Sequence, residues 1–151
     1  MPEQERSRVG VITIILAVGI KMNFSKVMNP QALTSMYGGV PDFSGSEISE
    51  IDFKRDEPRL SVKLLTQNKP MSSPVKWPEK YDQVCIELSF IGSRCVSFSE
   101  WGHENVVCEM LFDVVDDVVA ITILCANNSR LKFICDWVRV ESIRYGLMGT
   151  P

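Results

Sequence analysis

The sequence contains none of the short motifs that mark common catalytic or nucleotide-binding sites. It has no P-loop, no G-x-G-x-x-G, no H-E-x-x-H and no G-x-S-x-G. It also lacks a D-x-D-x-D-G calcium loop. Its only histidine is His103, and a lone histidine without further ligands at fixed spacing does not make a zinc site of the usual type. We therefore expect neither a metal nor another cofactor.

The chain also lacks an excess of positive charge. Its 151 residues include 16 Lys and Arg against 19 Asp and Glu, which gives a formal net charge of −3. Domains that bind nucleic acid usually carry a basic footprint, so this balance argues against nucleic acid as a direct partner. It is compatible with a basic protein partner. The hydrophobic content of 45% is that of an ordinary globular protein, and the length suits one domain with its own core.

No C-x-x-C pair occurs, and the number of cysteines, five, is odd. A secreted disulfide framework would use an even number placed to join loops. Here every cysteine falls inside a predicted strand, where a free thiol acts as a small apolar side chain. We therefore expect buried, free cysteines and a reducing, cytoplasmic compartment. The five are Cys85, Cys95, Cys108, Cys125 and Cys135.

The apolar run from Val9 to Ile20 is too short to span a bilayer. It has about 12 residues, whereas a spanning helix needs ~20. Its length suits a signal peptide, but the preceding flank is mixed in charge and no A-x-A-like cleavage site follows. We favour Met22 as the natural start, with a weak signal or anchor and an extra strand as alternatives. Residues 1–21 are therefore treated as an extension, and residues 22–151 as a single mostly-β domain without a membrane partner.

Alternation of apolar and polar residues dominates the chain from Tyr81 to Ile143. Successive side chains of a strand point to opposite faces, so a period of two predicts sheets with one apolar face. Turn residues at 92–93, 116–117 and 127–128 predict hairpins between these strands. The alternating apolar sets are Val84, Ile86, Leu88 and Phe90; Val106, Cys108, Met110 and Phe112; Val119, Ile121, Ile123 and Cys125; and Leu131, Phe133 and Cys135.

One short helix is predicted between Asn29 and Tyr37. Asn29 suits the N-cap and Pro30 the first helical position. Gly38 or Gly39 can end the helix in a left-handed conformation. The helix has barely two turns, so we expect it to lean on a sheet.

The remaining segments predict further strands of an antiparallel domain. Residues 47–54 form a strand with a bulge near Ile48, and residues 60–64 form the return strand. The proline-rich stretch 67–80 is a long connection that crosses the sheet, pinned by Trp77. The strand from Val106 has apolar residues on both faces, which predicts a central position. Together these patterns predict a single antiparallel sheet or sandwich-like domain of about seven or eight strands with one short N-terminal helix.

Residues near His103 permit a catalytic hypothesis. His103 could act as a general base with Glu100 or Glu104 beside it, as in a small hydrolase or transferase. We favour the alternative that residues 101–105 form a polar hairpin tip. Trp101 is out of phase with Phe98, so we expect it on the outer face, where it is a candidate interface anchor. A third hypothesis is an exported β module that binds glycans through its tryptophans.

Acidic residues form two groups, which either are solvated edges or steer a basic partner. The first group is Glu47, Glu50 and Asp52 on an early strand. The second is Asp113, Asp116 and Asp117 around a hairpin tip. We expect partner contacts at Asp113, Asp116 and Asp117, and at the tip formed by Trp101, His103 and Glu104. These tips flank opposite ends of one strand, and the acidic tip is preferred.

The order of features along residues 29–145 is similar to that of a known family. The matching features are Tyr37-Gly38, Val40-Pro41, Pro74-Val75-Lys76-Trp77, Phe90-Ile91-Gly92, Trp101-Gly102, the segment from Leu131 to Cys135, and Tyr145. In this order the chain resembles the immunity protein 50 family, predicted antitoxins of bacterial polymorphic toxin systems. The resemblance implies a mostly β, non-enzymatic protein that binds and neutralises a cognate toxin domain in the bacterium that produces it. It carries over no catalytic residue and no partner site.

Overall fold

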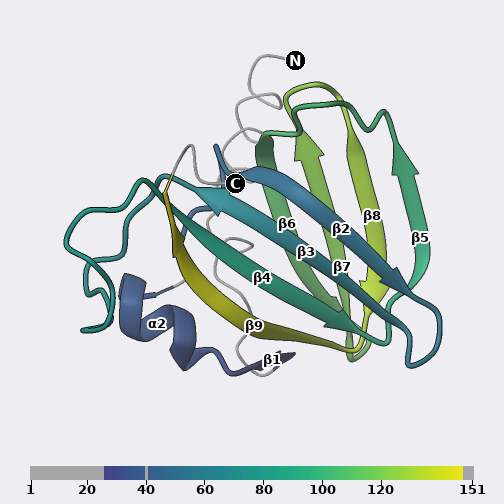
Figure 1. Cartoon of the computed structure of the whole chain (residues 1–151). Helices are drawn as coiled ribbons and strands as arrows, with labels where there is room; N and C mark the ends of the chain where they lie inside the picture. Colours follow the sequence, from purple (N-terminus) through teal and green to yellow (C-terminus); the bar gives the residue numbers. More distant parts are fainter. Residues whose placement is uncertain (1–25, 40, 148–151) are drawn as a thin grey trace, which may run out of the picture.

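Nine strands and one short helix make up the described part of the chain, residues 26–39 and 41–147 of a computed structural model (Figure 1). This confirms the mainly β prediction, with a two-residue strand added to the expected number. The elements are β1 (Val27–Met28), α2 (Gln31–Tyr37), β2 (Glu47–Lys54), β3 (Arg59–Thr66), β4 (Gln83–Ile91), β5 (Arg94–Ser99), β6 (Val107–Val115), β7 (Val118–Cys125), β8 (Arg130–Cys135) and β9 (Trp137–Gly146). The predictions for residues 1–21 fall outside the described residues.

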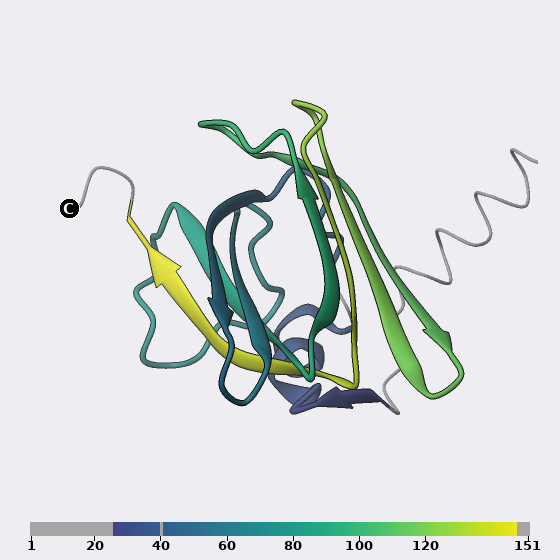
Figure 2. The ribbon, with the colours of Figure 1, turned by 90° about the vertical axis from the view of Figure 1, so that its right-hand side faces the viewer.

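The strands form two sheets that pack face to face (Figure 2). The first, sheet A, has five strands in the order β1-β9-β4-β3-β2, and the second, sheet B, has four in the order β5-β8-β7-β6. All pairs are antiparallel except β1 with β9. The alternating apolar residues meet between the sheets, where the rings of Phe90 and Phe133 lie 4.8 Å apart in an edge-to-face contact.

Two of the three predicted hairpins are present. Asp116 and Asp117 form the β6–β7 turn, and Asn127 and Asn128 lie in the β7–β8 turn. The prediction at Gly92 was wrong, because β4 belongs to sheet A and β5 to sheet B. Gly92 has a φ of 74° and its N–H donates to the carbonyl of Pro58, so the chain leaves sheet A there. Alternation predicts strands, but it does not say which sheet they join.

Residues 100–105 are not a hairpin tip either, because β5 and β6 lie at opposite edges of sheet B. For the same reason β6 is an edge strand and not the central strand expected. A register shift between Val107 and Glu109 changes its phase, so Val107 and Met110 are buried and Cys108 is exposed. The apolar residues on its other face therefore have no second layer among the described residues.

The proline-rich stretch 67–80 does not cross the sheet, since it joins the antiparallel neighbours β3 and β4. Trp77 does pin it to the domain, in ring contacts with Tyr81 at 5.4 Å and Tyr145 at 5.6 Å. The bulge expected in β2 is confirmed between Ile48 and Glu50.

The helix begins at Gln31, one residue later than an N-cap at Asn29 would place it. Asn29 has a φ of 61° and does not cap the helix; Pro30 is the N-cap residue, without a side-chain hydrogen bond. The Asn29 amide donates instead to the carbonyl of Val140 in β9 at 3.1 Å. Gly38 ends the helix with a φ of 73°, as expected. No helix among the described residues has the length and hydropathy to cross a membrane.

All five cysteines are free and lie in strands, but they are not all buried. Cys125 and Cys135 are buried, whereas Cys95 and Cys108 are exposed. Both exposed thiols lie at local irregularities in the pairing of their strands. Cys95 has a φ of 56° within the shifted register of β5, and Cys108 lies at the bulge of β6. Irregularities of this kind interrupt the period of two on which the prediction rested.

Candidate partner-binding surfaces

Side-chain amides hold the connection between β5 and β6 in one conformation. Asn105 is 1% exposed; its Oδ1 accepts from the Gly102 N–H at 3.0 Å, and its Nδ2 donates to the Gly102 carbonyl at 2.9 Å. Asn127, in the neighbouring β7–β8 turn, donates to the carbonyl of Glu104 at 3.0 Å. Glu100 has a φ of 62°, which a non-glycine residue adopts at some cost. The backbone of this connection is therefore preorganised.

Three exposed aromatic rings form a continuous strip at one side of the sandwich. Phe53 of β2 contacts Phe98 of β5 at 6.4 Å, and Phe98 contacts Trp101 at 5.5 Å. Their side chains are 53%, 42% and 42% exposed, respectively. Because β2 and β5 are the edge strands of different sheets, the aromatic strip lies where the two sheets meet without a covering strand (Figure 1). Sequence reasoning found Trp101 but missed Phe53 and Phe98, whose contact joins two separate sheets.

Trp101 lies at this seam and not on the outer face expected for it. With Phe98 it lines a shallow recess whose other wall includes Ile48 and Ile51 of β2. Arg130 of β8 borders the same recess. The strip thus continues inward to buried residues of sheet B, such as Ile123 and Leu131.

His103 and Glu104 lie exposed on the same connection. Within residues 26–39 and 41–147, no hydrogen bond or ion pair involves the side chains of His103, Glu100 or Glu104. A general base is normally oriented by a second group within hydrogen-bond reach. No such contact orients His103 among the described residues. Those residues also contain no cluster of three or more metal-ligating side chains.

The acidic tip at the β6–β7 turn is the hairpin expected from the sequence, but one of its carboxylates already has a partner. Asp116 and Asp117 have φ values of 49° and 66°, the left-handed pair that a tight hairpin turn requires. The Asp117 carboxylate accepts from the Lys26 ammonium at 2.8 Å, and that ammonium lies 4.6 Å from the ring centre of Trp137. The Lys26 side chain is 11% exposed and that of Asp117 is 89% exposed. The charge of Asp117 therefore balances a buried cation, and Asp113 and Asp116 have no ion pair among the described residues.

The two expected contact regions lie at opposite ends of β6, and the fold does not bring them together. Residues 101–104 precede Val107, and the acidic turn follows Val115. A strand of this length spans roughly 30 Å. A partner must be large to contact both regions at once.

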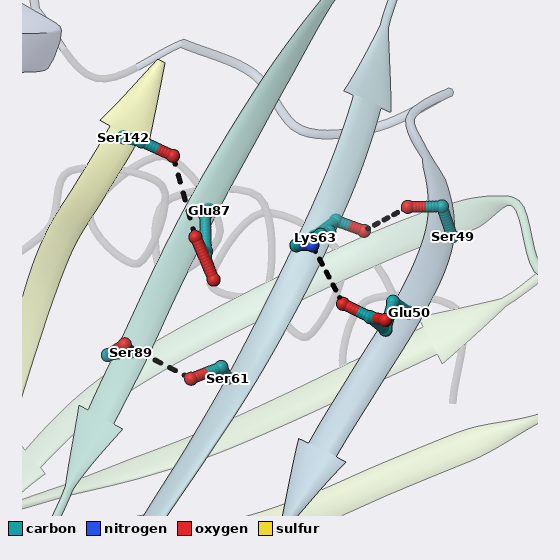
Figure 3. Close-up of polar contacts among 7 residues, drawn as sticks. All are labelled: Ser49, Glu50, Ser61, Lys63, Glu87, Ser89 and Ser142. Carbon is teal, nitrogen blue, oxygen red and sulfur yellow. Dashed lines mark hydrogen bonds and ion pairs between the residues drawn. The ribbon is translucent and has the colours of Figure 1, made fainter. Parts of the chain in front are cut away.

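The outer face of sheet A is polar, and its side chains bond to one another (Figure 3). The hydroxyls of Ser61 and Ser89 are 3.1 Å apart, and the Lys63 ammonium lies 2.9 Å from the Glu50 carboxylate. The hydrogen bond to Glu50 and the attraction of its charge raise the pKa of Lys63. Of the early acidic group, Glu50 is thus paired within the sheet.

One pocket lies beside the edge strand β6, with a volume of about 180 Å³. Pro41 and Phe43 of the connection before β2 form one wall, and Met110 and Phe112 the other. The Ser44 hydroxyl donates to the carbonyl of Cys108 at 2.8 Å and closes one end. The sequence contained no signal for this pocket, because its walls are distant in the chain.

Comparison with known proteins agrees with the resemblance noted in the sequence. The profile of a family described as immunity protein 50 matches residues 29–146. The match contains α2 and all strands from β2 to β9, and so covers nearly all of both sheets. No curated protein and no solved structure matches the chain.

Proposed function

The chain belongs to the immunity protein 50 family, and we propose that it binds and neutralises a cognate bacterial toxin domain. The match of that family's profile over residues 29–146 is the observation that carries this proposal. The family description supports a protein partner and a non-enzymatic role. On this proposal the protein acts in the cytoplasm of the bacterium that makes the polymorphic toxin.

The aromatic strip is the contact surface that the geometry favours. Interfaces draw most of their binding energy from a few large aromatic or arginine side chains that become fully desolvated. Phe98 and Trp101 are exposed, and the connection carrying Trp101 is held by Asn105 and Asn127. Because the connection is already ordered, binding costs little conformational entropy there. His103 and Glu104 extend the surface on the same connection.

The acidic tip is a second region, in which Asp113 and Asp116 supply the charge. Their role is to attract a basic toxin and speed its association. Asp117 contributes less to this field, because its charge is balanced by Lys26 at 2.8 Å. A typical partner buries about 800 Å² of a protein's surface. Binding over such an area would block the toxin sterically, with no chemical step.

Expression in a bacterial host tests the proposal. The toxin would be the C-terminal domain of the multidomain protein encoded beside this chain, expressed alone and together with it. We expect the toxin domain alone to stop growth, co-expression to restore growth, and the two proteins to co-purify as a complex. A host that stays poisoned despite folded, soluble protein of this chain would contradict the proposal.

A matched comparison separates binding from an enzymatic role. His103→Ala removes the only histidine of the chain. Neutralisation by binding predicts that this variant still protects cells, with at most a modest loss of affinity. Complete loss of protection in a variant that still forms the complex would favour the hydrolase or transferase alternative.

A further inference from the structure

The fold itself pairs the first residues of the edge strand β6 on the side away from β7. The Gly45 N–H donates to the Val107 carbonyl at 2.8 Å, and the Val107 N–H donates to the Ser46 carbonyl at 2.7 Å. The Ser44 hydroxyl donates to the carbonyl of Cys108, and the pairing stops there. From residue 109 to residue 115, β7 is the only described strand that pairs with β6. We call the other side of residues 109–115 the open edge.

The strand register shows which backbone groups face the open edge. The Cys125 N–H donates to the Ser129 carbonyl at 3.0 Å, so the backbone of Cys125 faces β8 and not β6. Because this direction alternates along an antiparallel strand, the backbone of Leu124 faces β6, as does every second residue before it in β7. Their partners on β6, beginning with Glu109, therefore face β7. The β6 residues between those partners present their N–H and C=O groups to the open edge; they are Met110, Phe112 and Val114.

The 180 Å³ pocket opens where the open edge begins. One of its walls is formed by Met110 and Phe112, whose backbone groups face the open edge. The charged residues that line it are Asp42 and Glu109, and both are acidic. Apolar walls beside carboxylates suit a lysine or arginine side chain, because its aliphatic stem packs on the walls while its charged end meets the carboxylates.

Carboxylates continue along the open edge beyond the pocket. Asp113 is exposed on β6 and Asp116 in the turn that follows it, and neither has an ion pair with another described residue. The cations on the outer face of sheet B are Arg130 and Lys132 of β8. They lie two strands from β6, at ~10 Å, and no ion pair joins them to it within the described residues. The open edge is therefore an acidic border that attracts a basic segment.

We propose that an extended basic segment of the toxin domain adds to sheet B as a fifth strand at the open edge of β6, with a lysine or arginine side chain in the pocket. The proposal rests on the proposed function and states how the toxin is held. In strand addition the main-chain hydrogen bonds supply affinity, and pockets for alternate side chains supply specificity. A second copy of this chain fits less well, because antiparallel pairing of two β6 edges would place the Glu109 and Asp113 carboxylates of both copies on one face, where like charges repel.

Backbone hydrogen exchange of the full chain, measured for each residue by NMR with and without the toxin domain, tests the added strand. In the free chain we expect the amides of Met110, Phe112 and Val114 to exchange faster than those of Leu111 and Asp113, which face β7. In the complex, exchange of the first three should slow at least ten-fold. Slow exchange in the free chain would show that the edge is already occupied, by the chain itself or by a second copy, and would overturn the proposal. Unchanged exchange in a complex that does form would also overturn it, whereas the absence of any complex would defeat the proposed function and this inference together.

Calorimetry with two pairs of variants gives an independent measurement. Val114→Pro removes an N–H that faces the open edge, a position that tolerates proline within the fold, and should raise the dissociation constant for the toxin domain roughly 30-fold. Val114→Ala keeps that N–H and should change the constant less than three-fold. Glu109→Gln should raise it about ten-fold, and Glu79→Gln, an exposed carboxylate on the 67–80 connection, less than two-fold. Equal affinities of the two Val114 variants would contradict the added strand, and equal affinities of the two glutamine variants would contradict the cation in the pocket. If Val114→Pro does not fold in urea unfolding controls, the exchange measurement decides on the strand.

Discussion

The side-chain amide of Asn127 donates to the side-chain oxygen of Asn105 at 2.9 Å, and this bond ties the β7–β8 turn to the β5–β6 connection. The Asn127 oxygen also accepts from the Ser129 N–H at 3.1 Å, so the turn itself is ordered by the same side chain. The Cβ of any other residue at position 102 would lie 2.8 Å from the side-chain nitrogen of Asn127. Glycine at this position is therefore what lets the connection approach the turn.

Replacing Asn105 with alanine should destabilise the fold by about 2 kcal/mol, because the Asn105 side chain is buried and makes three hydrogen bonds, to Gly102 and Asn127, that alanine cannot replace. The measurement is the free energy of unfolding in urea. Asn68→Ala is the matched control, since the Asn68 side chain is exposed and makes no hydrogen bond with the described residues. Equal stability of the two variants would mean that the network contributes nothing measurable.

Asp117→Asn should destabilise the protein more than Asp116→Asn. Both residues adopt positive φ in the same turn, and asparagine tolerates that conformation. Only Asp117 neutralises the buried Lys26 ammonium, at 2.8 Å. Because the Asp117 carboxylate is itself exposed, we expect a difference of about 1 kcal/mol and not the larger cost of a fully buried pair.

Thermal or urea unfolding of these two aspartate variants, measured at the same ionic strength, gives the comparison. Leaving the positive charge of Lys26 without its counter-ion is the physical cause of the difference. The expectation fails if both variants lose the same stability, since the ion pair would then be irrelevant to the fold.

Stability should fall at alkaline pH because burial raises the pKa of several weak acids, which stay protonated in the folded state where they would ionise in the unfolded state; the shifts of Cys135 and Tyr37 are large. Burial raises the pKa of Cys135 from 9.0 to about 12, and burial followed by the charge of Tyr81 raises the pKa of Tyr37 from 10.0 to about 12. Above pH 9 the unfolded chain therefore binds fewer protons than the folded chain. The contribution is fully present below pH 9 and is lost as pH rises toward 12, at ~1.4 kcal/mol per pH unit and group.

Urea unfolding between pH 8 and pH 11 measures this slope. Cys135→Ala should lower stability at pH 8 by opening a small cavity, yet flatten the fall above pH 9 by one group's contribution. Cys108→Ala is the control, because Cys108 is exposed. An unchanged slope in the Cys135 variant would mean that this thiol does not remain protonated in the fold.

The strands were predictable from sequence because the period of two is a local property. Val119, Ile121 and Ile123 alternate with solvent-facing residues in the chain as they do in β7. Turn positions 116–117 and 127–128 were predictable for the same reason, since short polar turns join neighbours in one sheet.

What the sequence could not supply was the assignment of strands to sheets, which depends on contacts between distant segments. The change of sheet at Gly92 and the pairing of Lys26 with Asp117 are of this kind. The aromatic strip depends on the change of sheet at Gly92, because Phe53 and Phe98 meet only when β2 and β5 are the edges of opposite sheets. Thus Trp101 was recognised as a candidate, while the surface around it was not.

The last prediction concerns that surface and depends on the proposed toxin partner. Trp101→Ala should raise the dissociation constant for the toxin domain roughly 30-fold, and Phe98→Ala should have an effect of the same order. Val75→Ala is the control, because Val75 is fully exposed on the 67–80 connection and belongs to neither contact region. Calorimetry with the purified toxin domain measures the affinities, and urea unfolding verifies that each variant is folded. If both aromatic variants bind like the Val75 variant, while substitution of Asp113 and Asp116 by lysine abolishes binding, the partner contacts the acidic tip and the aromatic strip is not its site.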